Sequence, residues 1–314
     1  MIGNQVENKF KYESAKKNKK KHVTADIVMY VCFYFICILF GLLCLYPFLQ
    51  VLISSFADET TLLIEGYKLI PSKFSLQAYK VVFNGSTIMD AYGITIFITV
   101  VGTIIQVIIT AMAAYALSGG RLKYRNVIGF FYYFTMLFSG GMVASYLLIT
   151  QYLHLDDTVW VYILPAAFNV WNCFLLRTFF NEIPKEIIES ASIDGANQGK
   201  IMFSIVLPLS LPALATIGLF AAVAFWNEWA AAQFYISDPE LYTLQYQIVL
   251  LTQSIDAATK AAQSGMGGDS SGILAPANTV RLATAIITVG PIIFLYPFLQ
   301  KYFVAGLRVG GVKG

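Results

Sequence analysis

The segment GANQGK, residues 195–200, has the residue types that come nearest to chemistry in this chain, because phosphate-binding loops combine glycines with a Gly-Lys-Ser/Thr ending. In such a loop the two glycines stand five residues apart, so Gly199 requires a glycine at position 194. Asp194 stands there, and Lys200 is followed by Ile201 instead of Ser or Thr. The spacing therefore predicts no nucleotide site in this chain.

The histidines and cysteines form no pattern for metal binding or catalysis either. His22 belongs to a lysine-rich tail, and His154 lies in the short segment QYLHLDDT. The cysteines lie inside apolar runs without metal-type spacing: Cys32, Cys37, Cys44 and Cys173. We expect no metal, no cofactor and no catalytic group in this chain.

Composition places the chain in a membrane. Apolar residues make up 57% of the sequence and charged residues only 12%, against about 25% in ordinary soluble domains. The mean hydropathy is +0.66. A net charge of +3 is too small to indicate binding of nucleic acid.

The expected fold is an all-α polytopic membrane protein with six transmembrane helices. Spanning the hydrocarbon layer takes about 20 helical residues, because unpaired backbone groups are too costly in lipid. The first span is too long for the apolar core of a signal peptide, so we expect an uncleaved anchor after a basic tail over residues 1–26. The permease-like remainder, 27–314, holds the predicted spans: 27–54, 92–117, 127–150, 158–180, 205–234 and 280–299.

The basic residues set the expected orientation, since Lys and Arg near span ends are retained on the cytoplasmic side. With both termini in the cytoplasm, sixteen of the 21 basic residues fall on that side. The lysine-rich tail is then expected to lie near anionic lipid headgroups. The loop over 181–204 also faces the cytoplasm.

This loop reads as two short helices that meet at a glycine. Pro184 suits the first turn of a helix, Gly195 can close it in the left-handed conformation, and Asn197 can cap the next helix. Such an elbow could dock into a groove on a soluble partner.

The elbow carries a family resemblance. The permease subunits of ATP-binding-cassette importers share Glu-Ala-Ala, three residues, Gly, nine residues, Ile, one residue, Leu-Pro. Only Ser190 departs from this pattern, which the chain matches at Glu189, Ala191, Gly195, Ile205, Leu207 and Pro208. The segments FSGGMVASYLL, LRTFFNEIP, FWNEW and LYPFLQKYFVAGLRVGGVKG resemble the carbohydrate branch, in particular its maltose-type and complex-oligosaccharide members. Ala144 stands where many relatives have proline, so the sequence leaves open whether the third span bends.

The resemblance implies a type I importer permease that forms half of a translocation pathway in a bacterial plasma membrane. The implied partners are a second homologous permease, two ATPase subunits that bind ATP and magnesium, an extracytoplasmic solute-binding lipoprotein and a carbohydrate. The carbohydrate would cross the membrane by alternating access. The implied ATPase-coupling residues are Glu189, Ser190, Ala191, Asp194, Gly195, Ile205, Leu207 and Pro208. Ala191 permits close approach to the ATPase, and Gly195 sets the angle between the two short helices. Glu189 can either pair with a basic group or cap a backbone N–H on the ATPase.

Polar groups inside the spans are candidates for the substrate pathway, because their exposure to lipid is expensive. Aromatic faces suit sugar rings, but Trp also favours membrane interfaces, so a sugar contact and a boundary belt or gate both stay open. The candidates are Asn169, Asn172, Trp226, Asn227, Glu228, Trp229 and Gln233. The loop over 236–279 opens with a possible surface helix and continues with small residues near 257–276, which either reach a binding protein or form a disordered connector.

Two other functional classes fit parts of the sequence. A membrane enzyme would be expected to cluster His, Asp or Glu at a span boundary, and only the pair Asp156 and Asp157 comes near this. A permease of the same superfamily for an amino acid, peptide or ion would keep the elbow but would lose FWNEW and the C-terminal QKYFVAGLRVGGVKG.

Overall fold

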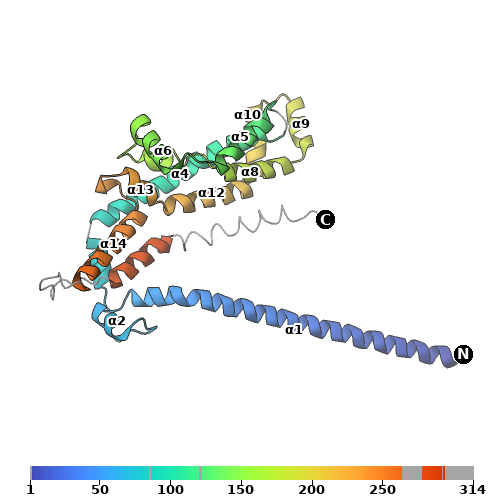
Figure 1. Cartoon of the computed structure of the whole chain (residues 1–314). Coiled ribbons are helices and arrows are strands. Elements are labelled where there is room, and N and C mark those ends of the chain that lie inside the picture. Colours follow the sequence, from blue (N-terminus) through green and yellow to red (C-terminus); the bar gives the residue numbers. More distant parts are fainter. Residues whose placement is uncertain (1, 85, 120–121, 264–277, 292, 294–314) are drawn as a thin grey trace. The chain divides into compact units, whose positions relative to one another are not determined.

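The computed structural model describes residues 2–84, 86–119, 122–263, 278–291 and residue 293 (Figure 1). Within these residues the regular elements are helices, and the pairing of Ala57 with Phe74 is an isolated antiparallel bridge. The C-terminal segment QKYFVAGLRVGGVKG and most of the stretch predicted near 257–276 lie outside the described residues. The chain divides into two compact units, residues 1–74 and 75–314.

The first unit consists of one long helix and a short outer segment. Helix α1 (Ile2–Ser54) contains the predicted first span, and its part over Met29–Ser54 has a mean hydropathy of 2.5. Its residues from Met29 to Leu49 are exposed, and Ser54 at its end is buried. Helix α2 (Glu59–Glu65) follows, and the Asp58 N–H donates to the Lys73 carbonyl at 3.1 Å. The bare apolar surface of α1 is what a helix in contact with lipid requires.

The second unit is built around α4 (Ser86–Leu117), which packs against several of the helices that follow. Its main partners are α12 (Leu211–Trp226) and α8 (Val170–Glu182). The other helices are α3 (Gln77–Asn84), α5 (Arg125–Leu137), α6 (Gly141–Leu147), η1 (Leu148–Tyr152), α7 (Trp160–Ile163), α9 (Lys185–Ile193), α10 (Gln198–Ile201), η2 (Met202–Val206), α11 (Leu207–Leu209), α13 (Ala230–Tyr235), η3 (Pro239–Leu241), α14 (Leu244–Gln263) and a final helix over 278–291. Helices α9 and α10 lie at one end of this unit, while α13 and α14 lie at the other (Figure 1).

Two of the predicted spans consist of two helices that meet at a sharp bend. In the third, α5 and the helix over Gly141–Tyr152 meet at 108°, and Gly141 takes a φ of +82°. The third span is therefore bent just before Ala144, although Ala144 replaces the proline of many relatives. In the fifth, the helices over Gln198–Leu209 and Leu211–Trp226 meet at 82°. By length and composition, two described helices can cross a membrane, and up to four spans result when each bent pair counts as one.

The fourth predicted span is also discontinuous. Between α7 and α8 the chain leaves the helix around Pro165, and Gln106 of α4 donates its side-chain N–H to the Ala166 carbonyl at 2.9 Å. A non-helical backbone at membrane depth is tolerated when protein groups satisfy it, so α4 supports this break directly. Residues 292 and 294–299 of the predicted last span lie outside the described part of the chain.

Close packing between α4 and α12 depends on a glycine. The ring of Phe225 lies over Gly102, where a Cβ atom would stand 2.7 Å from the ring. Phe225 is buried, so the ring has little room to move away. The small residue therefore allows the two helices to approach.

Candidate coupling site

The elbow has the glycine turn that its sequence predicts. Helix α9 ends at Ile193, Gly195 takes a φ of +80°, and the Ala196 N–H donates back to the Ala191 carbonyl at 3.0 Å. Asn197 then accepts the Lys200 N–H on its side-chain oxygen at 2.8 Å and caps α10. The local prediction of a left-handed glycine followed by an asparagine cap is confirmed.

The two faces of the elbow differ in burial. Ile188, Ala191 and Ala196 pack against the core cluster formed by α4, α8 and the segment from α10 to α12. On the other face, Ile193 is 86% exposed at the end of α9, beside the exposed Asp194. The elbow is therefore attached along one stripe and presents an apolar tip with acidic neighbours.

The signature residues divide between these two faces. Glu189 and Ser190 are exposed, and the Ser190 hydroxyl donates to the Ile187 carbonyl of its own helix at 3.1 Å. Ile205 and Leu207 are half-buried beneath the elbow, and Pro208 is exposed next to the bend at Ser210. Thus one part of the pattern holds the elbow to the core, and the other part is free to meet a partner.

A tyrosine at the end of α4 fixes the second half of the elbow. The buried Tyr115 hydroxyl lies 2.9 Å from the side-chain oxygen of Gln198 and 3.3 Å from its carbonyl oxygen. The Tyr115 ring also packs edge-on against Phe180, with ring centres 6.5 Å apart. Nearby, Asn181 accepts the Gly119 N–H on its side-chain oxygen at 3.2 Å. The ends of α4 and α8 and the start of α10 are thereby joined.

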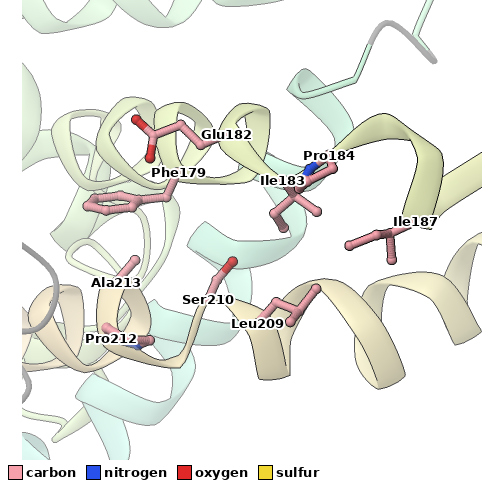
Figure 2. A pocket seen from close by; sticks show the side chains of 9 residues that line it. All are labelled: Phe179, Glu182, Ile183, Pro184, Ile187, Leu209, Ser210, Pro212 and Ala213. Carbon is pink, nitrogen blue, oxygen red and sulfur yellow. The ribbon is translucent and has the colours of Figure 1, made fainter. Parts of the chain in front are cut away.

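A pocket of about 240 Å³ lies beneath the first half of the elbow (Figure 2). In Figure 2, Ile183 and Ile187 stand on the elbow side, and Leu209 and Ser210 stand on the other. The full lining is Phe179, Glu182, Ile183, Pro184, Ile187, Leu209, Ser210, Pro212 and Ala213. Because this space separates the first turn of α9 from the start of α12, the elbow is attached through Ile188, Ala191, Ala196 and the Tyr115 contact.

Three of the candidate pathway residues use their polar groups within the fold. The Trp226 side chain is 6% exposed and donates its indole N–H to the Thr288 carbonyl at 3.2 Å. Asn227 donates its side-chain N–H to the Val223 carbonyl at 2.8 Å, and Glu228 accepts the Ala231 N–H at 2.8 Å. These contacts stabilise the break between α12 and α13.

The other pathway candidates lie on two separate elements. Asn169 caps α8 by accepting the Asn172 N–H at 3.0 Å, and the Asn172 side chain is buried. Trp229 and Gln233 are exposed one helical turn apart at the start of α13, where the Gln233 N–H donates to the Trp229 carbonyl at 3.1 Å. This last pair presents a ring and an amide on one exposed face.

The comparison with known families decides the class. The model of the binding-protein-dependent transport system inner membrane component matches residues 15–309. The chain belongs to this family. It is a permease subunit of an ATP-binding-cassette importer, and the resemblance drawn from the elbow is confirmed.

Relatives and solved structures resemble the permease over most of its length. The polygalacturonan/rhamnogalacturonan transport system permease protein YtcP of Bacillus subtilis is 40% identical over 281 residues, which cover 88% of this chain and 95% of that protein. The trehalose/maltose transport system permease protein MalG of Thermococcus litoralis is 30% identical, covering 88% and 94%. A bacterial ABC transporter involved in the import of the acidic polysaccharide alginate aligns with a TM-score of 0.76 at 30% identity, covering 89% of this chain and 98% of that one.

The structure adds polar positions on α4 of the permease that the sequence analysis missed. Thr99, Thr103, Gln106 and Thr110 recur at helical spacing, and each has a buried side-chain oxygen without a hydrogen-bond partner in the described structure. Thr95, one turn before them, accepts the Leu244 N–H at 2.9 Å and so holds the start of α14. Polar residues repeating every three or four positions in an apolar helix were the available signal.

Proposed function

We propose that this permease forms half of the translocation pathway of an ATP-driven carbohydrate importer, and that its elbow couples the pathway to a separate ATPase subunit. The observation that carries the proposal is the division of the elbow into a packed stripe and an exposed tip. Ile188 and Ala191 transmit movement to the core, while Glu189, Ser190 and Ile193 are available to a partner. An exposed apolar side chain among polar neighbours is a suitable anchor for a groove.

The proposed assembly contains this permease, a related second permease, two ATPase subunits and an extracytoplasmic solute-binding protein. ATP and magnesium are then bound by the ATPase subunits. The concentration of lysine and arginine at both termini and in the elbow supports a cytoplasmic position for all three. The segment over 236–279 would then face the binding protein.

Two routes connect the elbow with the helices of the pathway. Helix α9 contacts the core through Ile188 and Ala191, and α10 is held to α4 through Gln198 and Tyr115. Closure of the ATPase dimer would move the elbow as a rigid body and turn α4 and α12 with it. The permease would thereby alternate between inward-facing and outward-facing states.

Two of the relatives support a more specific substrate class. YtcP is named for polygalacturonan and rhamnogalacturonan, and the solved neighbour imports the acidic polysaccharide alginate. Both names denote polymers with uronate carboxylates, so we propose an oligosaccharide of the acidic class as the transported solute. The exposed Trp229 and Gln233 are the described residues best placed to meet a sugar ring and its hydroxyls.

Reconstitution of the complete importer in proteoliposomes tests this function. Uptake of oligogalacturonate should exceed uptake of maltodextrin and should require the binding protein and ATP. Gly195→Pro should abolish uptake, because proline fixes φ near −65° where the elbow needs +80°. Gly199→Ala is the control, since a Cβ there makes only an ordinary 3.5 Å contact with Asn197. Unchanged uptake by Gly195→Pro would refute the coupling role.

A further inference from the structure

The final helix, described over 278–291, contains a proline that leaves a carbonyl without its helical donor. Pro291 has no N–H, so the carbonyl of Ile287, four residues earlier, cannot be paired within the helix. In a membrane interior an unpaired carbonyl is costly, because no bulk water replaces the missing bond. Another helix must therefore supply the donor.

Two helices supply donors at this point. The Tyr92 hydroxyl of α4 donates to the Ile287 carbonyl at 2.5 Å. One residue further along, the Trp226 indole N–H at the end of α12 donates to the Thr288 carbonyl at 3.2 Å. The Tyr92 and Trp226 rings contact each other edge-on, with centres 6.5 Å apart and planes at 64°. We name this arrangement of Tyr92, Trp226, Ile287 and Thr288 the carbonyl clasp.

Two threonine hydroxyls of the final helix donate to other carbonyls of the same helix. Thr284 donates to the Val280 carbonyl at 2.7 Å, and Thr288 donates to the Thr284 carbonyl at 2.8 Å. Trp226 and Thr288 are both buried, and Ile287 packs against the same apolar cluster. In these surroundings a hydrogen bond to the backbone is strong and its loss is expensive.

The same two helices connect the clasp with the elbow. Tyr92 and Tyr115 both belong to α4, and their separation of 23 residues along the helix corresponds to about 35 Å, close to the thickness of the hydrocarbon layer. Helix α12 follows α10, η2 and α11 in the chain, after the 82° bend, and ends at Trp226. Movement at the elbow therefore reaches the clasp through two paths.

We propose that Tyr92 and Trp226 are positioning residues that fasten the final helix to α4 and α12 at its proline, so that the three helices move as one body during transport. This inference rests on the proposed function for its role in transport. The clasp itself rests on the geometry of Pro291 and the two donors. Its two consequences, for stability and for coupling, are separable by experiment.

A double-mutant cycle tests the clasp. Tyr92→Phe removes only the hydroxyl and should lower the unfolding midpoint of the purified complex by about 2 to 6 °C. Pro291→Ala restores an N–H for the Ile287 carbonyl, so Tyr92→Phe should have much less effect in that background. Equal effects of Tyr92→Phe in both backgrounds, or no effect in either, would overturn the proposal. This cycle needs no transported solute, so it stands even if the proposed substrate is wrong.

The coupling consequence is read from transport itself. In proteoliposomes Tyr92→Phe and Trp226→Phe should raise the amount of ATP hydrolysed per solute imported several-fold, and Pro291→Ala should rescue the Tyr92 variant. Trp160→Phe, which alters an exposed tryptophan of α7, should leave this ratio unchanged. A wild-type ratio in both clasp variants would show that the clasp has no part in coupling and would overturn the proposed positioning role.

Discussion

The hydroxyl of Tyr115 lies 2.9 Å from the side-chain oxygen of Gln198, which places a donor from the end of α4 on the first residue of α10. The two residues are 83 positions apart in the sequence. Because Asn197 caps α10 immediately before Gln198, this bond fixes the position of a helix start whose local geometry is already set. The contact is the most direct polar link between the elbow and the central helix.

Replacing Tyr115 by phenylalanine should weaken coupling without unfolding the permease. The change removes one hydrogen bond, worth about 0.5–1.5 kcal/mol, and leaves the ring packed against Phe180. We expect slower uptake with ATP hydrolysis largely retained, measured side by side in proteoliposomes. Tyr133→Phe on the exposed face of α5 is the matched control. Identical ATP consumption per solute in the two variants would argue against a role for this bond.

Ile193→Asp should separate assembly from folding. The side chain is 86% exposed, so its replacement should change the unfolding midpoint very little. If Ile193 enters a groove on the ATPase, a charge there should lower the affinity of the ATPase by at least about tenfold, measured by co-purification and titration. Ile64→Asp, at an isoleucine of α2 that is 84% exposed, serves as the comparison. Undiminished ATPase binding by Ile193→Asp would place the contact elsewhere.

Local chemistry made the elbow predictable from the sequence. A glycine followed two residues later by asparagine favours a left-handed turn and then a helix cap, and both form with Gly195 and Asn197. These features need no distant residue. The membrane location could also be predicted from the sequence, because it depends on the summed composition of long segments.

The helix breaks and the pathway residues depended on distant partners. Gln106 supports the break at Ala166 from 60 residues away, and Thr243 donates its hydroxyl to the Glu228 carbonyl at 2.6 Å. Trp226 has the residue type of a sugar-binding side chain, but its N–H donates to the carbonyl of Thr288, 62 residues later. Residue type alone could not show that these groups are already paired.

Acid should loosen the segment that follows α2. The Ser72 hydroxyl donates to both carboxylate oxygens of Glu65 at 2.8 Å, and the Lys68 amine lies 3.1 Å from one of them. These donors, Ser72 first, lower the pKa of Glu65 below its ordinary value of 4.5. The stabilisation is therefore complete above that value and is lost as the pH falls through the lower folded-state pKa.

Hydrogen exchange across residues 66–73, corrected for its intrinsic pH dependence, checks this expectation. The protection should decrease below about pH 4.5 in the wild type. Glu65→Gln should show the reduced protection already at neutral pH, because its neutral amide cannot replace the charged acceptor. Protection that is the same for both proteins at every pH would contradict a stabilising role for the Glu65 contacts with Ser72 and Lys68.

Gly102→Ala should destabilise the packing of α4 on α12. A Cβ at this position would lie 2.7 Å from the Phe225 ring, so the ring or the helix must shift, at a cost of about 1–3 kcal/mol. Gly93→Ala tests the same substitution in the same helix, where nothing lies within 4 Å of the new atom, and should be neutral or slightly stabilising. Thermal unfolding in detergent gives both values. Since the clash is with a side chain, Phe225→Leu should recover part of the loss in the Gly102 variant. Equal midpoints for the two glycine variants would mean that α12 does not approach α4 through Gly102.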